Sequence, residues 1–216
     1  VLLETILGIG MALVMAKDFH GRGLLRAAVL VPWAIPTAIT AKLWAFLFSE
    51  QGIVNSIFHA HVAWQTDPWA ARFSIILADV WKTTPFMALL ILAGLQMIPK
   101  DLYEAARMDG ANAWQRFTRI TLPLAKNSII VAVLFRMLDA LRMYDLPYIM
   151  VGPNPDSPTA TLSQLVVAAI RQDHVNAASA LSTLIFLLIF LIALCFVKSL
   201  GSKVAHQAEP VVAEEE

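Results

Sequence analysis

Residues 101–123 have the sequence DLYEAARMDGANAWQRFTRITLP and lie between two long apolar runs. We expect this segment to form an elbow of two short helices. Pro99 and Asp101 would begin the first helix, with Glu104 three residues after Asp101 at the spacing of a capping box. This helix would end at Asp109 and Gly110, because glycine readily adopts the positive φ found just beyond many helices.

The second short helix of the elbow has an apolar face. Trp114, Phe117 and Ile120 recur every three residues, and Pro123 would end the helix. Small side chains such as Ala105 would let the elbow fit closely into a groove on a partner protein. An amphipathic elbow lying on the membrane surface has the same pattern, and helix periodicity alone favours that alternative.

The composition on both sides of the elbow is that of a membrane protein. Of the 216 residues, 58% are hydrophobic and 15% are charged, against about 45–50% and about 25% in a soluble domain. The 16 basic and 16 acidic residues cancel, so no excess positive charge is available for nucleic acid. The single cysteine, Cys195, excludes a disulfide framework, and we expect no metal site.

Apolar runs of about 20 residues are candidates for membrane-spanning helices. Five such runs cover residues 1–16, 27–48, 73–98, 127–151 and 177–197. The first run opens in the middle of an apolar stretch, so we expect a chain that is truncated at its start. The sequence predicts an all-α, polytopic transmembrane bundle over residues 1–204, followed by a disordered acidic tail at 205–216.

Basic residues alternate between the connecting segments. Segments 17–26 and 99–126 carry three and five Lys or Arg residues, whereas the other two connections carry only Arg72 and Arg171. Cytoplasmic loops of membrane proteins retain Lys and Arg. Five crossings would therefore leave the N-terminus outside and the C-terminus in the cytoplasm.

The run 127–151 contains four charged residues, Arg136, Asp139, Arg142 and Asp145. Each would cost about 2.5–3.5 kcal/mol at the centre of a membrane helix, so they cannot all face lipid. Spacings of three would pair Arg136 with Asp139 and Arg142 with Asp145. Structural ion pairing between helices and the lining of a polar pathway are equally compatible with this pattern.

The third apolar run carries a polar stripe. Asp79, Lys82, Thr83 and Phe86 share one helix face, and Pro85 loosens the backbone beside them. A carboxylate, an amine, a hydroxyl and an aromatic ring suit a wet cavity that binds a polyol. The same stripe would also serve for packing against a neighbouring helix.

The second apolar run contains Pro32 and Pro36 one turn apart, followed by Trp33 and Thr37 respectively. Each proline removes a helix hydrogen-bond donor and frees a carbonyl that protein or cavity water must satisfy. For the prolines alone, an ordinary helix kink is the favoured interpretation.

Taken together, these segments resemble the permeases of ABC importers. The elbow is similar to the EAA loop of that family in its residues Glu104-Ala105-Ala106, Asp109-Gly110-Ala111, Phe117, Ile120 and Leu122-Pro123. The segments 30–36 and 135–145 resemble the maltose-type sugar permeases, and within that group the chain is most similar to permeases of actinobacterial trehalose importers. The similarity covers essentially the whole chain before the tail. Such permeases have at least six spans, so the resemblance implies that the first is missing here.

The resemblance implies a type I importer permease fold in a bacterial plasma membrane. The chain would pair with a second homologous permease, two cytoplasmic ATPases would bind the elbows, and an extracytoplasmic solute-binding lipoprotein would deliver a disaccharide such as trehalose or maltose. The permease would be no enzyme and would hold no cofactor, since ATP and Mg would be bound by the partner ATPase.

The resemblance also implies two sets of functional residues. The ATPase-coupling set comprises Glu104, Ala105, Asp109, Gly110, Ala111, Leu122 and Pro123. The substrate-pathway set comprises Trp33, Thr37, Asp79, Thr83, Phe86, Ala140 and Met143, to which we add the polar neighbours Asp139 and Arg142. The stripe on the third apolar run gives Asp79, Thr83 and Phe86 independently.

Two other classes of protein remain as alternatives. A proton-coupled secondary carrier would use the charged residues of 127–151, but it would leave the elbow unexplained. An intramembrane enzyme fits less well, because all five histidines lie outside the expected spans and no glycine-rich phosphate loop is present.

Overall fold

The computed structural model describes residues 1–59, 61–154 and 156–208, and this part of the chain is helical without any strand. The elements are α1 (Leu2–Ala16), α2 (Arg22–Ala34), α3 (Thr37–Leu47), α4 (Ile53–Phe58), α5 (Pro68–Gln96), α6 (Lys100–Met108), α7 (Ala113–Arg116), the π-helical turn η1 (Phe117–Thr121), α8 (Leu122–Leu141), α9 (Asp145–Met150), α10 (Leu162–Arg171) and α11 (Val175–Ala208). The all-α prediction is confirmed. A disordered tail was expected from residue 205, whereas α11 continues to Ala208, and residues 209–216 lie outside the described part.

Three helices in the described part are long and apolar enough to cross a membrane. They are α5, the helix Ala113–Leu141 formed by α7, η1 and α8, and the segment Val175–Lys198 of α11. Helices α2 and α3 add a fourth if the bent pair is counted as one span, while α1 and α10 are apolar but shorter. By length and composition these residues support three or four crossings, where the sequence predicts five.

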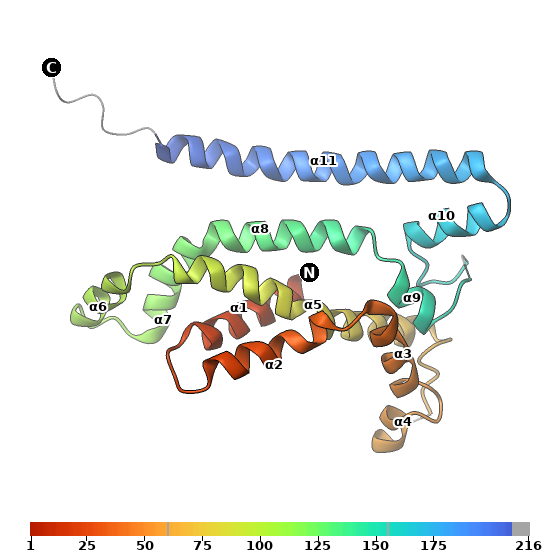
Figure 1. The fold of residues 1–216 in the computed structure, drawn as a ribbon, viewed down its shortest axis with the longest axis horizontal. Coiled ribbons are helices and arrows are strands. Elements are labelled where there is room, and N and C mark those ends of the chain that lie inside the picture. Colours follow the sequence, from red (N-terminus) through yellow and green to blue (C-terminus); the bar gives the residue numbers. More distant parts are fainter. Residues whose placement is uncertain (60, 155, 209–216) are drawn as a thin grey trace.

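The central helix is α5, which lies between α1 and α8 (Figure 1). The Asp67 side chain accepts hydrogen bonds from the backbone N–H groups of Trp69 and Ala70, at 3.1 and 2.8 Å, and so caps its first turn. Gly8 of α1 lies against α5, because a Cβ at that position would sit 3.3 Å from Cβ of Met87. Small residues at such crossings let membrane helices pack closely.

The chain turns by 86° between α2 and α3. Pro32 is tolerated inside α2, but Ile35 and Pro36 adopt extended backbone between the two helices. A residue before proline is disfavoured in the helical conformation, so Pro36 excludes Ile35 from the helix. The expectation of an ordinary kink in a continuous span 27–48 is therefore wrong. The carbonyl of Ile35 instead accepts a hydrogen bond from Nζ of Lys82.

The predicted run 127–151 is also interrupted. Helix α8 ends at Leu141, residues 142–144 are non-helical, and α9 begins at Asp145. Pro147 has no N–H to bond the carbonyl of Met143, which accepts instead from the Thr161 hydroxyl at 2.8 Å. The expected Arg142–Asp145 pair does not form, because the break separates these residues.

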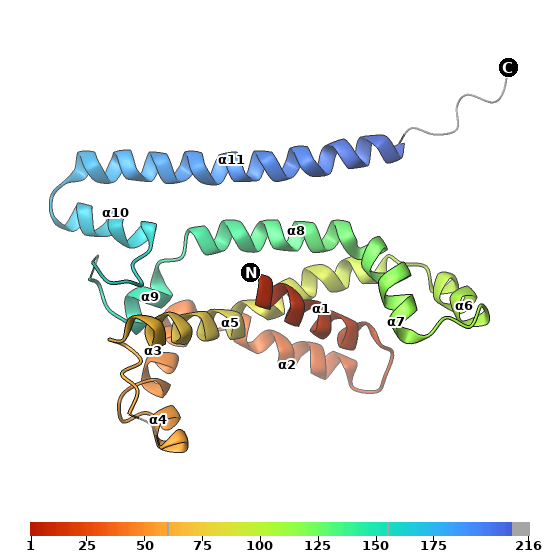
Figure 2. The same ribbon diagram turned by 180° about the vertical axis from the view of Figure 1, so that it is seen from behind.

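The two ends of the molecule have different elements. Helices α6 and α7 lie at one end, and α3, α4, α9 and α10 lie at the other (Figures 1 and 2). Helix α11 runs along the outside of the bundle, where it contacts α10 and α8 and has no buried residue in its apolar window. Its apolar surface is therefore available to lipid or to another membrane subunit.

Candidate functional site

The elbow predicted from the sequence is present at one end of the molecule (Figure 1). Helix α6 ends at Met108 with Asp109 as its C-cap, and Gly110 follows with a φ of +77°, as expected. The expected capping box at Asp101 is wrong, because Pro99 occupies the N-cap position of α6 and makes no side-chain cap. A capping box begins α7 instead, where the Asn112 side chain accepts from the N–H of Gln115 at 2.9 Å and the Gln115 side chain accepts from the N–H of Asn112 at 2.8 Å.

The second elbow helix does not end at Pro123. It continues through η1 into α8 as the 29-residue helix Ala113–Leu141. Proline is tolerated in the first turn of α8, where the π-helical turn changes the hydrogen-bond register just before it. The elbow is therefore a direct extension of a helix long enough to span the membrane.

The coupling residues taken from the resemblance lie on two elements, α6 with the turn after it and the start of α8. Glu104, Ala105, Asp109 and Gly110 are exposed on or just after α6 and Ala111 is half-buried, whereas Leu122 and Pro123 lie on α8. The elbow also exposes Met108 and Trp114, with 89% and 70% of their surfaces accessible. Large apolar side chains at an exposed tip mark an interaction surface, and this signal singles out Met108, which the sequence analysis missed.

A second candidate site lies near the corner between α2 and α3. A cavity of about 190 Å³ is lined by Thr37, Asp79, Lys82, Thr83, Asp139, Arg142, Met143, Tyr144, Asp145 and Leu146. Six of the nine predicted substrate-pathway residues are in this lining. These six residues lie on α3, on α5, at the end of α8 and just after α8. The fold therefore brings them together from three separate apolar runs.

The other three pathway residues lie outside this lining. Trp33 and Phe86 stack on each other, with ring centroids 5.4 Å apart and an angle of 15° between the rings. Ala140 is half-buried on α8. The structure therefore separates the aromatic pair from the polar cavity, although both lie beside the corner formed by α2 and α3.

Behind the cavity, the guanidinium of Arg136 is surrounded by three carboxylates. Its Nε lies 2.9 Å from Glu4, its Nη2 binds Asp79, and its Nη1 lies 3.4 Å from Asp139. The Thr83 hydroxyl donates to the other oxygen of Glu4 at 2.7 Å. We call these five residues the Arg136 cluster, and it joins α1, α5 and α8.

The members of the Arg136 cluster differ in exposure. The side chains of Arg136 and Glu4 are 2% and 0% exposed, while those of Asp79 and Asp139 are 17% and 62% exposed. The predicted Arg136–Asp139 pair is confirmed. A buried charge is tolerated only when it is paired, so Arg136 and Glu4 hold the helices together, and Asp79 and Asp139 present their carboxylates to the cavity.

Glu4 was missed by the sequence analysis. It is a carboxylate within an otherwise apolar helix, and an ionisable residue in such a helix is a functional candidate by default. That signal could have found it. Among the described residues, no group of three His, Cys, Asp or Glu side chains is placed to hold a metal ion.

Comparisons with known proteins identify the family of the chain. Residues 4–206 match the family described as binding-protein-dependent transport system inner membrane component. The chain is 45% identical over 201 residues to the trehalose/maltose transport system permease protein MalF of Thermococcus litoralis, which covers 91% of this chain and 68% of that protein. It is 39% identical over 204 residues to the trehalose transport system permease protein SugA of Mycobacterium tuberculosis, covering 94% of this chain and 66% of the relative.

Solved structures share the fold. A chain of a bacterial alginate ABC transporter, in complex with a periplasmic protein that binds an alginate pentasaccharide, superposes with a TM-score of 0.79 at 25% identity, over 89% of this chain and 70% of that one. The MetNI methionine ABC transporter superposes with a TM-score of 0.65 at 16% identity, over 93% of this chain and 88% of that one. The chain spans about two thirds of the length of the two permeases named above.

Proposed function

Because the chain belongs to the family of binding-protein-dependent transport system inner membrane components, we propose that it is the permease subunit of an ATP-driven sugar importer. The observation that carries the proposal is the helix Ala113–Leu141, which joins the elbow at one end to the polar cavity at the other. A movement imposed on the elbow by a cytoplasmic partner would be transmitted along this helix to Asp139 and the residues that follow it.

We propose that the cavity contacts the sugar during its passage. Asp79 and Asp139 would accept hydrogen bonds from sugar hydroxyls, and Thr37 and Thr83 can both donate and accept. The stacked rings of Trp33 and Phe86 would supply apolar contact to a sugar ring. A disaccharide such as trehalose or maltose fits the names of the two permeases compared above.

For the elbow, we propose binding to a cytoplasmic ATPase that holds ATP and Mg. Glu104 and Asp109 would meet polar groups of the ATPase, and Gly110 would allow close approach of its backbone. Met108 and Trp114 are the exposed apolar side chains that such an interface would bury. Hydrolysis would belong to the ATPase, and this chain would supply the moving pathway.

The topology that we propose has five crossings, in which α1 and the bent pair α2–α3 each count as one. The elbow and the C-terminus would lie in the cytoplasm, in agreement with the basic residues of segments 17–26 and 99–126. A second permease would complete the pathway, and an extracytoplasmic solute-binding lipoprotein would deliver the sugar. The exposed apolar surface of α11 is available for lipid or for the second permease.

The test is tagged purification from the native plasma membrane in mild detergent, followed by mass spectrometry and reconstitution into liposomes. We expect an ATPase, a second permease and a solute-binding lipoprotein to co-purify, and we expect uptake of labelled trehalose or maltose to require ATP. Uptake driven by a pH gradient without ATP would instead identify a proton-coupled secondary carrier and would overturn the proposal.

A further inference from the structure

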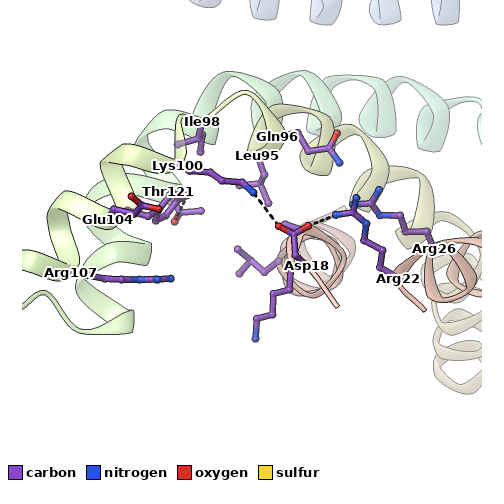
Figure 3. A pocket seen from close by; sticks show the side chains of 14 residues that line it. Asp18, Arg22, Arg26, Leu95, Gln96, Ile98, Lys100, Glu104, Arg107 and Thr121 are labelled. Carbon is purple, nitrogen blue, oxygen red and sulfur yellow. Dashed lines mark hydrogen bonds and ion pairs between the residues drawn. The ribbon is translucent and has the colours of Figure 1, made fainter. Parts of the chain in front are cut away.

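A separate cavity of about 960 Å³ lies behind the elbow (Figure 3). It is bounded by the connection between α1 and α2, by the end of α5 and by the inner face of α6. None of the substrate-pathway residues is part of its lining. The proposed sugar pathway therefore gives this cavity no role, although Glu104 of the proposed ATPase-coupling set is part of its lining.

The lining of this cavity is strongly basic. Its cations are Lys17, Arg22, Arg26, Lys100 and Arg107, and its only acidic residues in the described part of the chain are Asp18 and Glu104. Five positive and two negative side chains leave a formal charge of +3 on the cavity wall. The chain as a whole has a formal net charge of zero, so positive charge is concentrated here.

Contacts with other residues of the protein neutralise only part of this positive charge. Asp18 accepts a hydrogen bond from Nζ of Lys100 at 3.1 Å and pairs with Arg22, and Figure 3 shows it between these two side chains. The hydrogen bond and the positive charge of Lys100, together with Arg22, hold the pKa of Asp18 below its usual value. Arg26 is fixed by two hydrogen bonds to the carbonyl of Met15, at 3.3 and 2.7 Å. That carbonyl is neutral and does not cancel the charge of Arg26.

Two of the five cations are not held by hydrogen bonds or ion pairs of this kind. The side chains of Lys17 and Arg107 make no hydrogen bond or ion pair within the part of the chain that the structure describes. In Figure 3 Arg107 points from α6 into the cavity. Lys17 belongs to the same lining, at the end of α1. The cavity therefore presents free cationic groups from two segments that are far apart in the sequence.

The uncharged part of the wall is mixed. Leu13 and Ala16 of α1 and Leu95 and Ile98, at and just beyond the end of α5, are apolar, whereas Gln96, Tyr103 and Thr121 are polar. A small soluble anion would use only the cationic side of such a site. A phospholipid with an anionic headgroup uses both sides, because its phosphate contacts cations and its glycerol and first acyl carbons contact apolar side chains.

We propose that this cavity binds the headgroup of an anionic phospholipid from the leaflet on the elbow side of the membrane. The phosphate would lie between Lys17 and Arg107, with Arg22 and Arg26 beside it. A lipid held there would link the α1–α2 connection to the elbow, so the lipid composition of the membrane would influence the movement of α6. This inference rests on the proposed topology, which places the elbow at the membrane surface, and not on the identity of the sugar.

The test uses the protein together with whatever subunits co-purify with it, reconstituted in nanodiscs of phosphatidylcholine with increasing phosphatidylglycerol. Native mass spectrometry would count retained phosphatidylglycerol for three forms: the unaltered protein, the double variant Lys17→Gln/Arg107→Gln, and the control Arg119→Gln/Lys126→Gln. The control removes the same charge from the same side of the membrane, but neither of its residues lines the cavity. We expect about ten-fold weaker retention in the first double variant and little change in the control.

Three results would overturn the inference. Equal retention in both double variants would show that the cavity does not select the headgroup. Loss of a co-purifying ATPase from the Lys17→Gln/Arg107→Gln variant, with lipid retention unchanged, would assign these cations to a protein interface. Binding of inorganic phosphate to lipid-depleted protein as tightly as phosphatidylglycerol would identify a free-anion site. Sugar uptake measured on the same preparations tests the transport proposal separately.

Discussion

The two ends of the helix Ala113–Leu141 are organised in opposite ways. At the elbow end, the helix start is made by neighbours in the sequence, the capping box of Asn112 and Gln115, and the link to a distant segment is the exposed pair of Lys100 and Asp18. At the cavity end, Arg136 binds carboxylates from α1 and α5 that are distant in the sequence. The elbow is therefore a locally encoded, exposed surface suited to a partner, whereas the cavity exists only when three helices pack correctly.

This contrast predicts that the largest effect on stability comes from Arg136. Replacing it by methionine removes the only cation that contacts both Glu4 and Asp79 in the described part of the chain, and leaves the buried carboxylate of Glu4 with the amine of Val1, 3.1 Å away, as its ionic partner. Breaking a buried ion pair costs about 3–5 kcal/mol. We expect Arg136→Met to lower the thermal unfolding temperature in detergent strongly and to reduce the yield of folded protein.

The matched control is Arg142→Gln, which removes the same charge six residues further along. Arg142 is 65% exposed and its nearest carboxylate oxygen, on Asp139, is 3.9 Å away, so its loss should cost under about 1 kcal/mol. Adding Glu4→Gln to Arg136→Met should restore part of the lost stability, because the buried negative charge of Glu4 is removed as well. Equal unfolding temperatures for Arg136→Met and Arg142→Gln would show that the Arg136 cluster does not hold the helices together.

The same contrast explains what the sequence could predict. The long apolar helices, the Gly110 turn and the stripe of Asp79 and Thr83 depend on spacing within one segment, and they were predicted. The residues that this stripe contacts, Arg136 and Glu4, were not predicted, because their contacts depend on the packing of α1 against α5 and α8. A sequence pattern identifies a helix face, but it does not identify the helix that the face meets.

The errors at the helix breaks have a related cause. Pro36 and Pro147 are visible in the sequence, yet their effect depends on which group satisfies the freed carbonyl. Lys82 bonds the carbonyl of Ile35, which lies at the corner just before Pro36, and Thr161 bonds the carbonyl of Met143, which Pro147 leaves without a helical donor. These long-range hydrogen bonds stabilise a sharp corner in one case and a helix break in the other, where proline alone indicates only a kink.

A second prediction separates sugar contact from helix packing at the cavity end. Asp79→Asn keeps the size of the side chain and leaves Arg136 paired with Glu4, so we expect only a modest loss of stability. A hydrogen bond to a charged group contributes about 1.5–3 kcal/mol, and the sugar concentration for half-maximal ATP-driven uptake should therefore rise about ten-fold or more.

The control for this change is Asp173→Asn, which lies at the start of the connection to α11, outside the cavity. Asp173 has a positive φ of 62°, which asparagine tolerates well, so the substitution should be neutral. If Asp79→Asn leaves the concentration dependence of uptake unchanged, Asp79 does not belong to the sugar pathway, whatever its role in the Arg136 cluster.

A third prediction tests the elbow by a purely local change. Gly110 has a φ of +77°, and a Cβ there would meet no atom within 4 Å, so Gly110→Ala perturbs the backbone without a steric clash. The left-handed conformation costs an alanine about 1–2 kcal/mol. We expect about ten-fold weaker retention of the ATPase and correspondingly slower uptake, with the stability of the membrane helices unchanged.

Two further variants determine whether conformation is the cause. Gly110→Asn should be milder than Gly110→Ala, because asparagine adopts positive φ more readily. Gly23→Ala is the control, since a Cβ at Gly23 also meets nothing within 4 Å and its φ is not positive. Equal ATPase retention in all three variants would remove Gly110 from the coupling surface.

The smallest expected effect concerns Asp18, which links the α1–α2 connection to the elbow through Lys100. The three side chains of this link, Asp18, Lys100 and Arg22, are 63%, 83% and 48% exposed, and exposed ion pairs contribute little. Because Lys100 and Arg22 lower the pKa of Asp18, its contribution is present above the usual carboxyl pKa of about 3.9 and is lost as the pH falls through the lower folded value. Asp18→Asn should therefore be slightly less stable than the unaltered protein at pH 7, and the difference should vanish in acid.

The control is Asp101→Asn, because Asp101 is an exposed acid of α6 without an ion pair among the described residues. This variant should show no such pH-dependent difference in stability. An equal response of both variants would mean that the effect comes from general charge and not from the link between the elbow and the bundle.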